Sequence, residues 1–319
     1  MTSKILILGA CGQIGSELTL ALREKYSTDS VIASDIKASN LELVNSGPFE
    51  VIDATDYNSI KNCIENHEID TVYLLAAMLS ATGEKYPEKA WHLNMTSLFN
   101  VLNLAKEGYI KHVFWPSSIA AFGPTTPKNN TPQNTIMEPT TVYGITKQVG
   151  ERWCEYYYKN YGVDVRSVRY PGIISWKTLP GGGTTDYAID IYHKALSQNN
   201  YDCFLAENTE LPMMFMDDAI RATIELMHAD PSQLTVRSSY NLSAISFSPK
   251  DVAESIKSEI PDFRITYTPD FRQVIARTWP NSIDDSLARK DWNWKHQYSL
   301  KDITKEMLQQ LKKTKLHLD

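Results

Sequence analysis

The sequence predicts an α/β protein built on a doubly wound parallel sheet, and three observations support this fold class. Short runs of β-branched and apolar residues alternate with stretches of helical periodicity, as in a sheet whose strands are joined by crossover helices. The runs are apolar on both faces, which a sheet covered by helices on both sides requires. At 319 residues the chain can bury a large core as one α/β unit or two joined lobes.

Six strands are expected first, and they read KILIL from residue 4, SVIAS from 30, FEVID from 49, TVYLLAA from 71, HVFWPSS from 112 and VDVRSVRY from 163. The helix between the first two strands has one apolar stripe, formed by Ile14, Leu18, Ala21 and Leu22. The regularity weakens after about residue 171. We therefore assign residues 1–170 to a cofactor-binding domain and residues 171–212 and 244–319 to a smaller substrate-binding lobe. Segments near 213–243, with a helix at 218–228 and a strand at 239–242, are expected to return to the first domain.

Composition and charge exclude several classes of protein. With 32 basic and 38 acidic residues the formal net charge is −6, and no dense basic cluster precedes the C-terminal tail, so nucleic acid is not an expected partner. No apolar run approaches about 18 residues and the N-terminus lacks signal-peptide character, so a cytoplasmic protein without membrane spans is expected. The four cysteines lie far apart without metal-ligand spacing, so we expect reduced thiols and no metal site.

The segment GACGQIG places Gly9, Gly12 and Gly15 between the first expected strand and its helix. Glycines at such a turn let the backbone approach a pyrophosphate, and the helix N-terminus offers free N–H groups to the anion. The spacing is GxxGxxG rather than GxGxxG, and glycine is common at strand-to-helix turns in any case. Between a strand and a helix, however, the segment predicts a Rossmann-type dinucleotide site.

Two acids at strand ends refine the expected cofactor. Asp35 stands 20 residues after Gly15 at the end of the second strand, where an acid accepts hydrogen bonds from the adenosine ribose and repels a 2′-phosphate. This favours NAD over NADP. Only the nearby Lys37, a cation, weighs against this preference. Asp53 ends the third strand, where it either meets the adenine or serves as a turn acid, and both interpretations stay open.

A tyrosine and a lysine in TVYGITK, Tyr143 and Lys147, lie at i and i+4 on one expected helix face. Such a pair carries little weight alone, because the chain contains a second one, Tyr57 and Lys61. Only Tyr143 follows a strand that ends in PSSIAAFG and so presents two serines at the carboxyl edge of the sheet. We therefore interpret Tyr143 as the functional tyrosine and Tyr57 as a structural one.

Together these features resemble the extended, epimerase-like short-chain dehydrogenase/reductase superfamily over the first 170 residues; they are Gly9, Gly12, Gly15, LLAA at 74–77, Ser118, Tyr143 and Lys147. The resemblance implies that Tyr143 is a general base, that Lys147 lowers its pKa and binds the nicotinamide ribose, and that Ser118 holds the substrate oxygen. Ser117 would be a neighbouring helper. Asn94 falls where the superfamily often keeps a structural asparagine, and an ordinary polar helix position is an equal alternative. The expected cofactor-binding set is Gly9, Gly12, Gln13, Ile14, Gly15, Asp35, Asp53, Ala54, Leu75, Ala76, Ala77, Asn94, Tyr143, Lys147 and Tyr170.

A narrower resemblance comes mainly from the second half of the chain. The segments AAMLSATGEK at 76–85, RYPGIIS at 169–175, LPGGGTTDYAIDIY at 179–192, LPMMFMDDAI at 211–220 and SIDDSLARKDW at 282–292 are similar to short-chain L-threonine 3-dehydrogenases. Phe215 and Asp217 depart from that family, in which MMYMPD is common. The resemblance implies NAD-dependent oxidation of the 3-hydroxyl of L-threonine to L-2-amino-3-oxobutyrate. A 2-amino-3-oxobutyrate CoA ligase would then use the product.

The helix expected to carry Tyr143 continues as ERWCEYYYKNY and has more aromatic surface than packing against a sheet requires. The aromatic residues are Trp153, Tyr156, Tyr157 and Tyr161. By resemblance to the superfamily, we expect this helix to pair with its copy in a two-fold homodimer.

The stretch PGGGTTDY at 180–187 places three of the chain's 14 glycines side by side. A flexible turn followed by Thr184 as a helix N-cap would explain it structurally. We also expect a hinged lid, in which Thr184 and Thr185 receive the substrate carboxylate and Asp186 its ammonium. The expected substrate-binding set is Ser80, Ser117, Ser118, Tyr143, Gly182, Thr184, Thr185 and Asp186.

Two other functions remain open at this stage. A nucleotide-sugar epimerase or reductase would use the same first domain, but it would need a large second-lobe pocket for a diphosphate. Few arginines lie in suitable loops, with Arg272 and Arg277 the main exceptions. A non-catalytic NAD-sensing module would be expected to lack Tyr143 or Lys147, and both are present.

Overall fold

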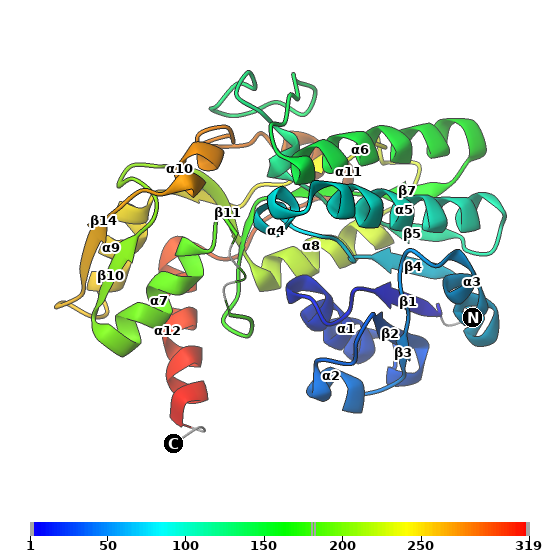
Figure 1. The fold of residues 1–319 in the computed structure, drawn as a ribbon, viewed down its shortest axis with the longest axis horizontal. Coiled ribbons are helices and arrows are strands. Elements are labelled where there is room, and N and C mark those ends of the chain that lie inside the picture. Colours follow the sequence, from blue (N-terminus) through cyan, green and yellow to red (C-terminus); the bar gives the residue numbers. More distant parts are fainter. Residues whose placement is uncertain (1–2, 180, 182, 317–319) are drawn as a thin grey trace. The chain divides into compact units, whose positions relative to one another are not determined.

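Six parallel strands form the central sheet of the structure, a computed structural model that describes residues 3–179, 181 and 183–316 (Figure 1). In spatial order they are β3 (Phe49–Val51), β2 (Val31–Asp35), β1 (Ile5–Leu8), β4 (Thr71–Leu74), β5 (His112–Phe114) and β7 (Asp164–Arg166), and each neighbouring pair is parallel. The chain order reverses between β1 and β4, so the carboxyl ends of these strands form the crevice at which such sheets bind ligands. The predicted doubly wound sheet is confirmed.

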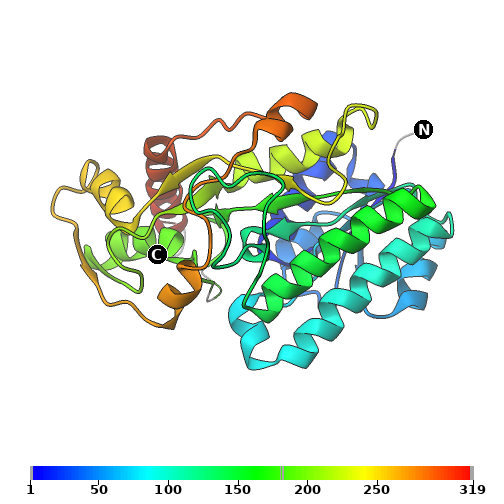
Figure 2. The same ribbon diagram turned by 90° about the horizontal axis from the view of Figure 1, so that it is seen from above.

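Helices cover both faces of this sheet. They are α1 (Gln13–Lys25), α2 (Leu41–Asn45), α3 (Tyr57–His67), α4 (Ser80–Lys85), α5 (Pro87–Lys106) and α6 (Val142–Tyr161). Figures 1 and 2 show α5 and α6 side by side on one face, and Figure 1 shows α1 on the other. Each crossover therefore returns the chain to a parallel strand, as the alternating pattern of the sequence requires.

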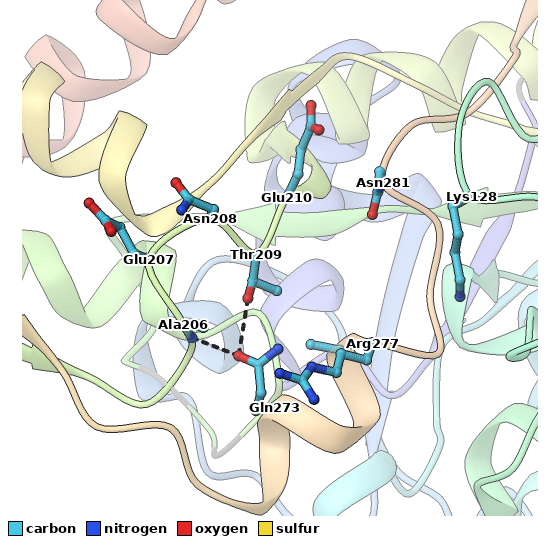
Figure 3. A pocket seen from close by; sticks show the side chains of 10 residues that line it. Lys128, Ala206, Glu207, Asn208, Thr209, Glu210, Gln273, Arg277 and Asn281 are labelled. Carbon is cyan, nitrogen blue, oxygen red and sulfur yellow. Dashed lines mark hydrogen bonds between the residues drawn. The ribbon is translucent and has the colours of Figure 1, made fainter.

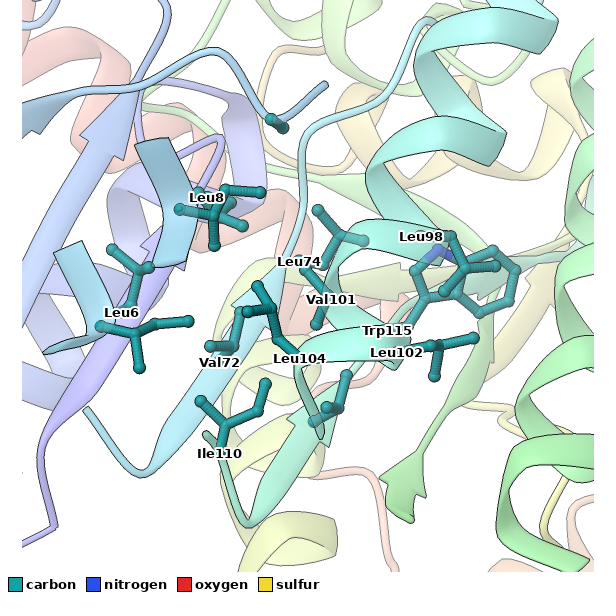
Figure 4. Close-up of a cluster of buried hydrophobic side chains, with 14 of the residues drawn as sticks. Leu6, Leu8, Val72, Leu74, Leu98, Val101, Leu102, Leu104, Ile110 and Trp115 are labelled. Atoms are coloured by element: carbon teal, nitrogen blue, oxygen red, sulfur yellow. The ribbon is translucent and has the colours of Figure 1, made fainter. Parts of the chain in front are cut away.

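Side chains at alternate strand positions fill the layer between the sheet and α5 (Figure 4). Leu6 and Leu8 of β1 and Val72 and Leu74 of β4 face the same side, because successive side chains of a strand point to opposite faces. The helix contributes Leu98, Val101, Leu102 and Leu104, and all of these residues are buried. This packing fixes the carboxyl ends of β1 and β4, from which the glycine loop and the segment after β4 leave.

The segment VDVRSVRY was expected as one strand, and this expectation was wrong. β7 ends at Arg166, and a second strand, β8, covers Val168–Tyr170. Ser167 between them is buried, and its hydroxyl lies 2.8 Å from that of Ser239. Its carbonyl also accepts a hydrogen bond from the N–H of Tyr240. β8 accordingly leaves the main sheet and lies between β6 (Ser117–Ser118) and β12 (Tyr240–Asn241).

The chain divides into two compact units, Met1–Ala121 with Thr141–Arg169 and Ala222–Tyr240, and Phe122–Thr140 with Tyr170–Arg221 and Asn241–Asp319. Two long segments expected in the first domain belong to the second unit, as do Tyr170 and residues 241–243. Residues 122–140 do so because Asn241 donates to the carbonyl of Thr131 at 3.0 Å and to the side chain of Gln133 at 2.7 Å. Residues 213–221 do so because the strand that begins this segment pairs within the second unit.

The second unit contains two small sheets, with strand orders β13-β11-β9 and β10-β14. Its strands are β9 (Gly172–Ile174), β10 (Asn200–Cys203), β11 (Leu211–Phe215), β13 (Ile245–Phe247) and β14 (Arg264–Tyr267). Its helices are α7 (Tyr187–Gln198), α9 (Pro249–Lys257), α10 (Phe271–Ala276), α11 (Ser286–Trp292) and α12 (Leu300–Leu316), while α8 covers Met216–His228. Within the described ranges, no helix combines the length and apolar character that crossing a membrane demands.

Candidate active site

The glycine loop joins the end of β1 to the start of α1. Gly9 has a φ of +90°, and a Cβ there would lie 2.5 Å from the backbone nitrogen of Ala76, so only glycine fits. A Cβ on Gly15 would lie 2.2 Å from the carbonyl oxygen of Gly9. Gly12, the N-cap residue, has no atom nearer to its ideal Cβ position than the Gly9 oxygen at 3.4 Å. Two glycines thus permit close packing, and Gly12 keeps the approach to the helix open.

The start of α1 has the properties of an anion site. No side chain among the described residues caps this helix, and its first turn, which contains Gln13 and Ile14, carries no acid. The N–H groups of the first turn and the positive end of the helix dipole are therefore available to a phosphate.

A cavity of about 250 Å³ adjoins this loop. Eight of the expected cofactor-binding residues line it, namely Gly9, Gly12, Asp35, Asp53, Ala54, Leu75, Ala76 and Ala77. Sequence reasoning missed four apolar lining residues, Leu8, Ile36, Ile52 and Leu93. Leu8, Ile36 and Ile52 lie at or next to strand ends, so their chain positions could have identified them, whereas Leu93 lies on α5 and gave no such signal.

Asp35 links the glycine loop to the end of β2. Its Oδ2 accepts a hydrogen bond of 2.9 Å from the N–H of Cys11, and its Oδ1 accepts one of 2.8 Å from the N–H of Ile36. The carboxylate is thereby held in the cavity wall, in the position where a ribose diol is bound in such folds. With the open helix N-terminus and the apolar slot, this acid gives a set of residues that fits the adenosine and pyrophosphate parts of NAD.

Asp53 makes the turn contacts of one of its two expected roles. Its Oδ1 accepts hydrogen bonds from the N–H and the hydroxyl of Thr55, at 2.9 and 2.8 Å. Because the residue also lines the cavity, the turn role does not exclude an adenine contact, which stays a prediction.

Replacing Asp35 by serine is expected to weaken NAD binding and to improve the relative affinity for NADP. The substitution removes the acceptor for the ribose hydroxyls and the charge that repels a 2′-phosphate. Calorimetric titration of both dinucleotides into the parent and into Asp35→Ser would measure the change. An unchanged preference would mean that Asp35 does not meet the ribose.

The helix that carries Tyr143 and Lys147 is fixed at its start by two acceptors. The side-chain oxygen of Thr141 accepts from the N–H of Gly144 at 3.1 Å, and Glu84 of α4 accepts from the N–H of Val142 at 2.8 Å. These bonds satisfy N–H groups that the helix itself leaves free. They hold the first turn of α6, and with it Tyr143, in a defined place.

The structure brings together the three expected catalytic residues, Ser118, Tyr143 and Lys147. The side chain of Ser118 lies beside the phenol of Tyr143 and favours its ionised form, which lowers its pKa. The ammonium nitrogen of Lys147 donates to the carbonyl of Pro116 at 2.5 Å and lies 5.4 Å from the centroid of the Tyr143 ring. Residues 116–118 therefore hold both members of the tyrosine–lysine pair.

Burial changes the pKa values of this pair in opposite directions. Burial raises the pKa of Tyr143 to about 12, and its hydrogen bond with Ser118 offsets this in part. Lys147 is 4 % exposed, and burial lowers the pKa of its ammonium to about 7, against the opposing effects of Cys154 and Glu151. The expected lowering of the Tyr143 pKa is thus absent in the protein alone, because desolvation of the phenolate outweighs the effect of Ser118.

Ser117 does not have the environment of a substrate contact. It is buried, and its hydroxyl donates to Glu151 at 2.6 Å. Glu151 is 0 % exposed and is bound by the guanidinium of Arg169 at 2.8 and 2.9 Å. Alternation along β6 turns Ser117 to the face opposite Ser118. Its expected helper role finds no support in this geometry, which instead ties the 116–118 segment to α6.

Asn94 on α5 makes three hydrogen bonds within the protein. Its side chain accepts from the N–H of Met78 at 2.8 Å, donates to the Met78 carbonyl at 3.2 Å and donates to the hydroxyl of Thr146 at 3.1 Å. These contacts hold the segment after β4 against α6, as a structural asparagine would. A direct cofactor contact of Asn94 stays a prediction, as does that of Tyr170, a buried residue at the end of β8.

The expected substrate residues fall on both units, and the structure describes each group by itself. Ser80 is buried at the first position of α4 in the first unit. Thr184, Thr185 and Asp186 lie in the second unit, and Gly182 lies outside the described residues.

The loop before α7 is closed by Asp186 rather than by Thr184. The carboxylate of Asp186 accepts from the N–H of Gly183 at 2.7 Å, and α7 begins at the next residue, Tyr187. The expectation that Thr184 is the N-cap was therefore wrong, because the acid two residues later occupies that position. Asp186 therefore has a structural role in the loop. Its contact with the substrate ammonium stays a prediction.

Comparison with known proteins gives the family of this chain. A Staphylococcus aureus protein described as an uncharacterized epimerase/dehydratase is 50% identical over 308 residues, 96% of each chain. The solved holo form of a GalE-like L-threonine dehydrogenase from Cupriavidus necator is 59% identical, with a TM-score of 0.94 over 97% of this chain and 99% of that one. A solved structure named as a monomeric L-threonine 3-dehydrogenase, from a metagenome, is 50% identical with a TM-score of 0.92 over 97% and 99%. The resemblance to L-threonine 3-dehydrogenases is thus confirmed, and the model of the NAD dependent epimerase/dehydratase family matches residues 5–243. The chain belongs to the NAD dependent epimerase/dehydratase family.

Proposed function

We propose that this protein is an NAD-dependent L-threonine 3-dehydrogenase, which oxidises the 3-hydroxyl of L-threonine to L-2-amino-3-oxobutyrate. The observation that carries the proposal is the close placement of Ser118 and Tyr143 beside the buried Lys147. Support comes from the full-length similarity to the Cupriavidus necator enzyme, which is named for this substrate.

In this proposal, the phenolic oxygen of Tyr143 takes the proton of the threonine 3-hydroxyl, and the hydroxyl of Ser118 holds the substrate oxygen in place. Bound NAD supplies the hydride acceptor and a further positive charge beside the phenol. Within the chain, the Lys147 ammonium favours the phenolate form of Tyr143. Glu151, one turn further along α6, favours the protonated form of Lys147 and so opposes the effect of burial on its pKa.

The residues that would hold NAD are those of the glycine loop and the adjoining cavity. The N–H groups at the start of α1 bind the pyrophosphate, Asp35 binds the adenosine ribose, and the apolar lining residues enclose the adenine. Lys147, in addition to its effect on Tyr143, binds the nicotinamide ribose. Asn94 keeps the Ala76–Met78 segment in position against this site.

Thr185→Ala is expected to raise the KM for L-threonine much more than the KM for NAD. In the proposal, the hydroxyl of Thr185 helps to receive the substrate carboxylate, and loss of one polar partner in a dry site costs about 1 to 3 kcal/mol. Steady-state kinetics with each substrate varied in turn would measure both constants. The matched control is Thr266→Ala on β14 of the same unit, which should leave both constants unchanged. Parent-like kinetics of Thr185→Ala would remove Thr185 from the site.

The reaction itself is tested by mixing the purified protein with NAD and either L-threonine or a UDP-sugar and following NADH. Formation of NADH with L-threonine alone supports the proposal. Conversion of the UDP-sugar instead, followed by chromatography because an epimerase returns the hydride and releases no NADH, would favour a nucleotide-sugar epimerase or reductase. NAD binding without turnover of either compound would favour an NAD-sensing module.

We also propose that the protein forms a two-fold homodimer through α5 and α6. The aromatic rings of Phe99, Trp153, Tyr156 and Tyr161 are part of one cluster of edge-to-face contacts on these helices, and Tyr156 and Tyr161 are 45% and 44% exposed. Such rings are enriched in protein interfaces. Because one similar solved structure is named as monomeric, the oligomeric state of this protein needs a direct measurement. Light scattering at micromolar concentration would give the mass, and a monomeric mass would contradict the proposal.

The proposed setting is the cytoplasm, where the four cysteines, which are free in this structure, would stay reduced. There the product would pass to a 2-amino-3-oxobutyrate CoA ligase, or it would lose its carboxylate as CO₂ and leave aminoacetone. The substrate is a small molecule, and neither nucleic acid nor membrane has a part in the proposal.

A further inference from the structure

The second unit contains a polar cavity that the proposed oxidation does not use (Figure 3). Its volume is about 470 Å³, within the range typical of small-molecule sites. It is lined by the loop 206–210, by Gln273, Ala276 and Arg277 at the end of α10, and by Lys128 and Asn281. None of these residues belongs to the sets proposed for NAD or for threonine.

A buried amide with a fixed orientation faces this cavity. Gln273 is 6 % exposed, and its Oε1 accepts hydrogen bonds from the N–H of Ala206 at 2.6 Å and from the hydroxyl of Thr209 at 3.0 Å. Because both acceptor positions are used on this side, the Nε2 donor must point the other way. Figure 3 shows it on the side of Arg277. Among the residues that the structure describes, no acceptor is bonded to this donor, which is open to the cavity and available to a ligand.

Two cations, Arg277 and Lys128, line the same cavity without a carboxylate partner in the described part of the chain. The guanidinium of Arg277 points toward Gln273 in Figure 3. The ammonium of Lys128 donates to the carbonyl of Trp279 at 3.2 Å, and burial lowers its pKa. A partly desolvated ammonium without a counter-charge is stabilised by a bound anion.

The other charged groups nearby do not neutralise these two cations. Glu207 is paired with Lys250 at 3.2 Å, and in Figure 3 the carboxylate of Glu210 points away from Gln273 and Arg277. Arg272, on the same helix as Gln273, differs from Arg277 because it has a carboxylate partner. It is paired with Asp270 at 2.6 Å and lies over the ring of Phe204. Arg277 and Lys128 are thus the two cavity-lining cations without a carboxylate partner among the described residues, and Glu210 is a lining carboxylate that points away from Arg277.

We propose that this cavity is a second ligand site, which binds the phosphate group of a small phosphorylated metabolite. Arg277, the Nε2 of Gln273 and Lys128 supply donors from three separate side chains, which suits the three free oxygens of a phosphate monoester better than the two oxygens of a planar carboxylate. The cavity is much larger than a phosphate and leaves room for the organic part of the ligand. Such a ligand is an effector rather than a reactant, because it shares no residue with the proposed reaction.

The test is calorimetric titration of the full-length protein with inorganic phosphate and with glycerol 3-phosphate at constant ionic strength. Saturating NAD is present throughout, so that the glycine loop cannot contribute a phosphate site. We expect saturable binding of glycerol 3-phosphate, weakened about tenfold or more in Arg277→Gln, since a charge-assisted pair is lost. Gln273→Glu keeps an acceptor for Ala206 and Thr209 but replaces the donor, and it should abolish binding.

The control variant is Arg264→Gln, which removes the same charge from an exposed arginine on β14 away from the cavity. It should bind like the parent. Absence of saturable binding of either probe by the parent, or equal affinity of the parent and both cavity variants, would overturn the proposal. Binding of inorganic phosphate but not of glycerol 3-phosphate would overturn the part that assigns an organic ligand. NAD binding, measured in the same variants, should be unchanged whether or not the proposed oxidation is correct.

Discussion

Tyr143→Phe is expected to lower turnover of L-threonine by about 10² to 10⁴, the usual contribution of a positioned acid or base. The substitution removes only the phenolic oxygen, which is the group placed beside Ser118. NAD affinity should survive, because the glycine loop, Asp35 and the adjoining cavity are untouched. Turnover is measured by NADH formation, and NAD affinity by calorimetric titration.

The matched control is Tyr57→Phe, which removes the phenol of the second tyrosine–lysine pair in the chain. Tyr57 lies on α3, and its hydroxyl is hydrogen-bonded to Glu107 rather than to a serine at the sheet edge. Its loss should leave turnover unchanged. Near-normal turnover of Tyr143→Phe would place the base elsewhere, and equal losses in both variants would point to a general effect on folding.

Glu151→Gln is expected to lower the free energy of unfolding by about 3 to 5 kcal/mol, the cost of breaking a buried ion pair. Glu151 is 0 % exposed and pairs with the equally buried Arg169 at 2.8 Å. The neutral amide would leave that guanidinium in the core without its counter-charge. Equilibrium unfolding in urea, followed by fluorescence, measures the difference at a common slope.

Glu155→Gln is the control for this change, on the same helix four residues later. Its carboxylate is partly exposed and pairs with Arg152 at 2.9 Å and Lys159 at 2.8 Å. Such surface pairs contribute about 0 to 1 kcal/mol. If the two variants lose similar stability, the buried pair is not a major contributor to the fold.

The sequence was sufficient to predict the elements whose signals are local. Apolar runs located all six strands of the main sheet, and the glycine spacing located the turn before α1. The sequence also predicted correctly that Tyr143, rather than Tyr57, lies next to Ser118. Chain order alone indicates which helix follows the strand that ends in two serines. These inferences need only the periodicity of the chain and the rules of parallel sheets.

What the sequence did not reveal depends on contacts between distant residues. Ser167 interrupts the last expected strand because it meets Ser239, which is 72 positions away. The hydroxyl of Ser117 is bound by Glu151, 34 positions away. The pKa of Tyr143 rises because of its burial, a property of the assembled core. Periodicity and propensity carry no information about such pairs.

The two bonds of Asp35 have a consequence for engineering the cofactor preference. Oδ2 accepts from the N–H of Cys11 in the glycine loop, so the carboxylate that we expect to discriminate between NAD and NADP also holds that loop in place. A designer who removes it to admit a 2′-phosphate also loosens the main chain that must hold the pyrophosphate. A useful redesign therefore restores an acceptor for the N–H of Cys11 as well as adding a cation for the 2′-phosphate. A single replacement of Asp35 shifts the preference toward NADP but weakens the binding of both NAD and NADP.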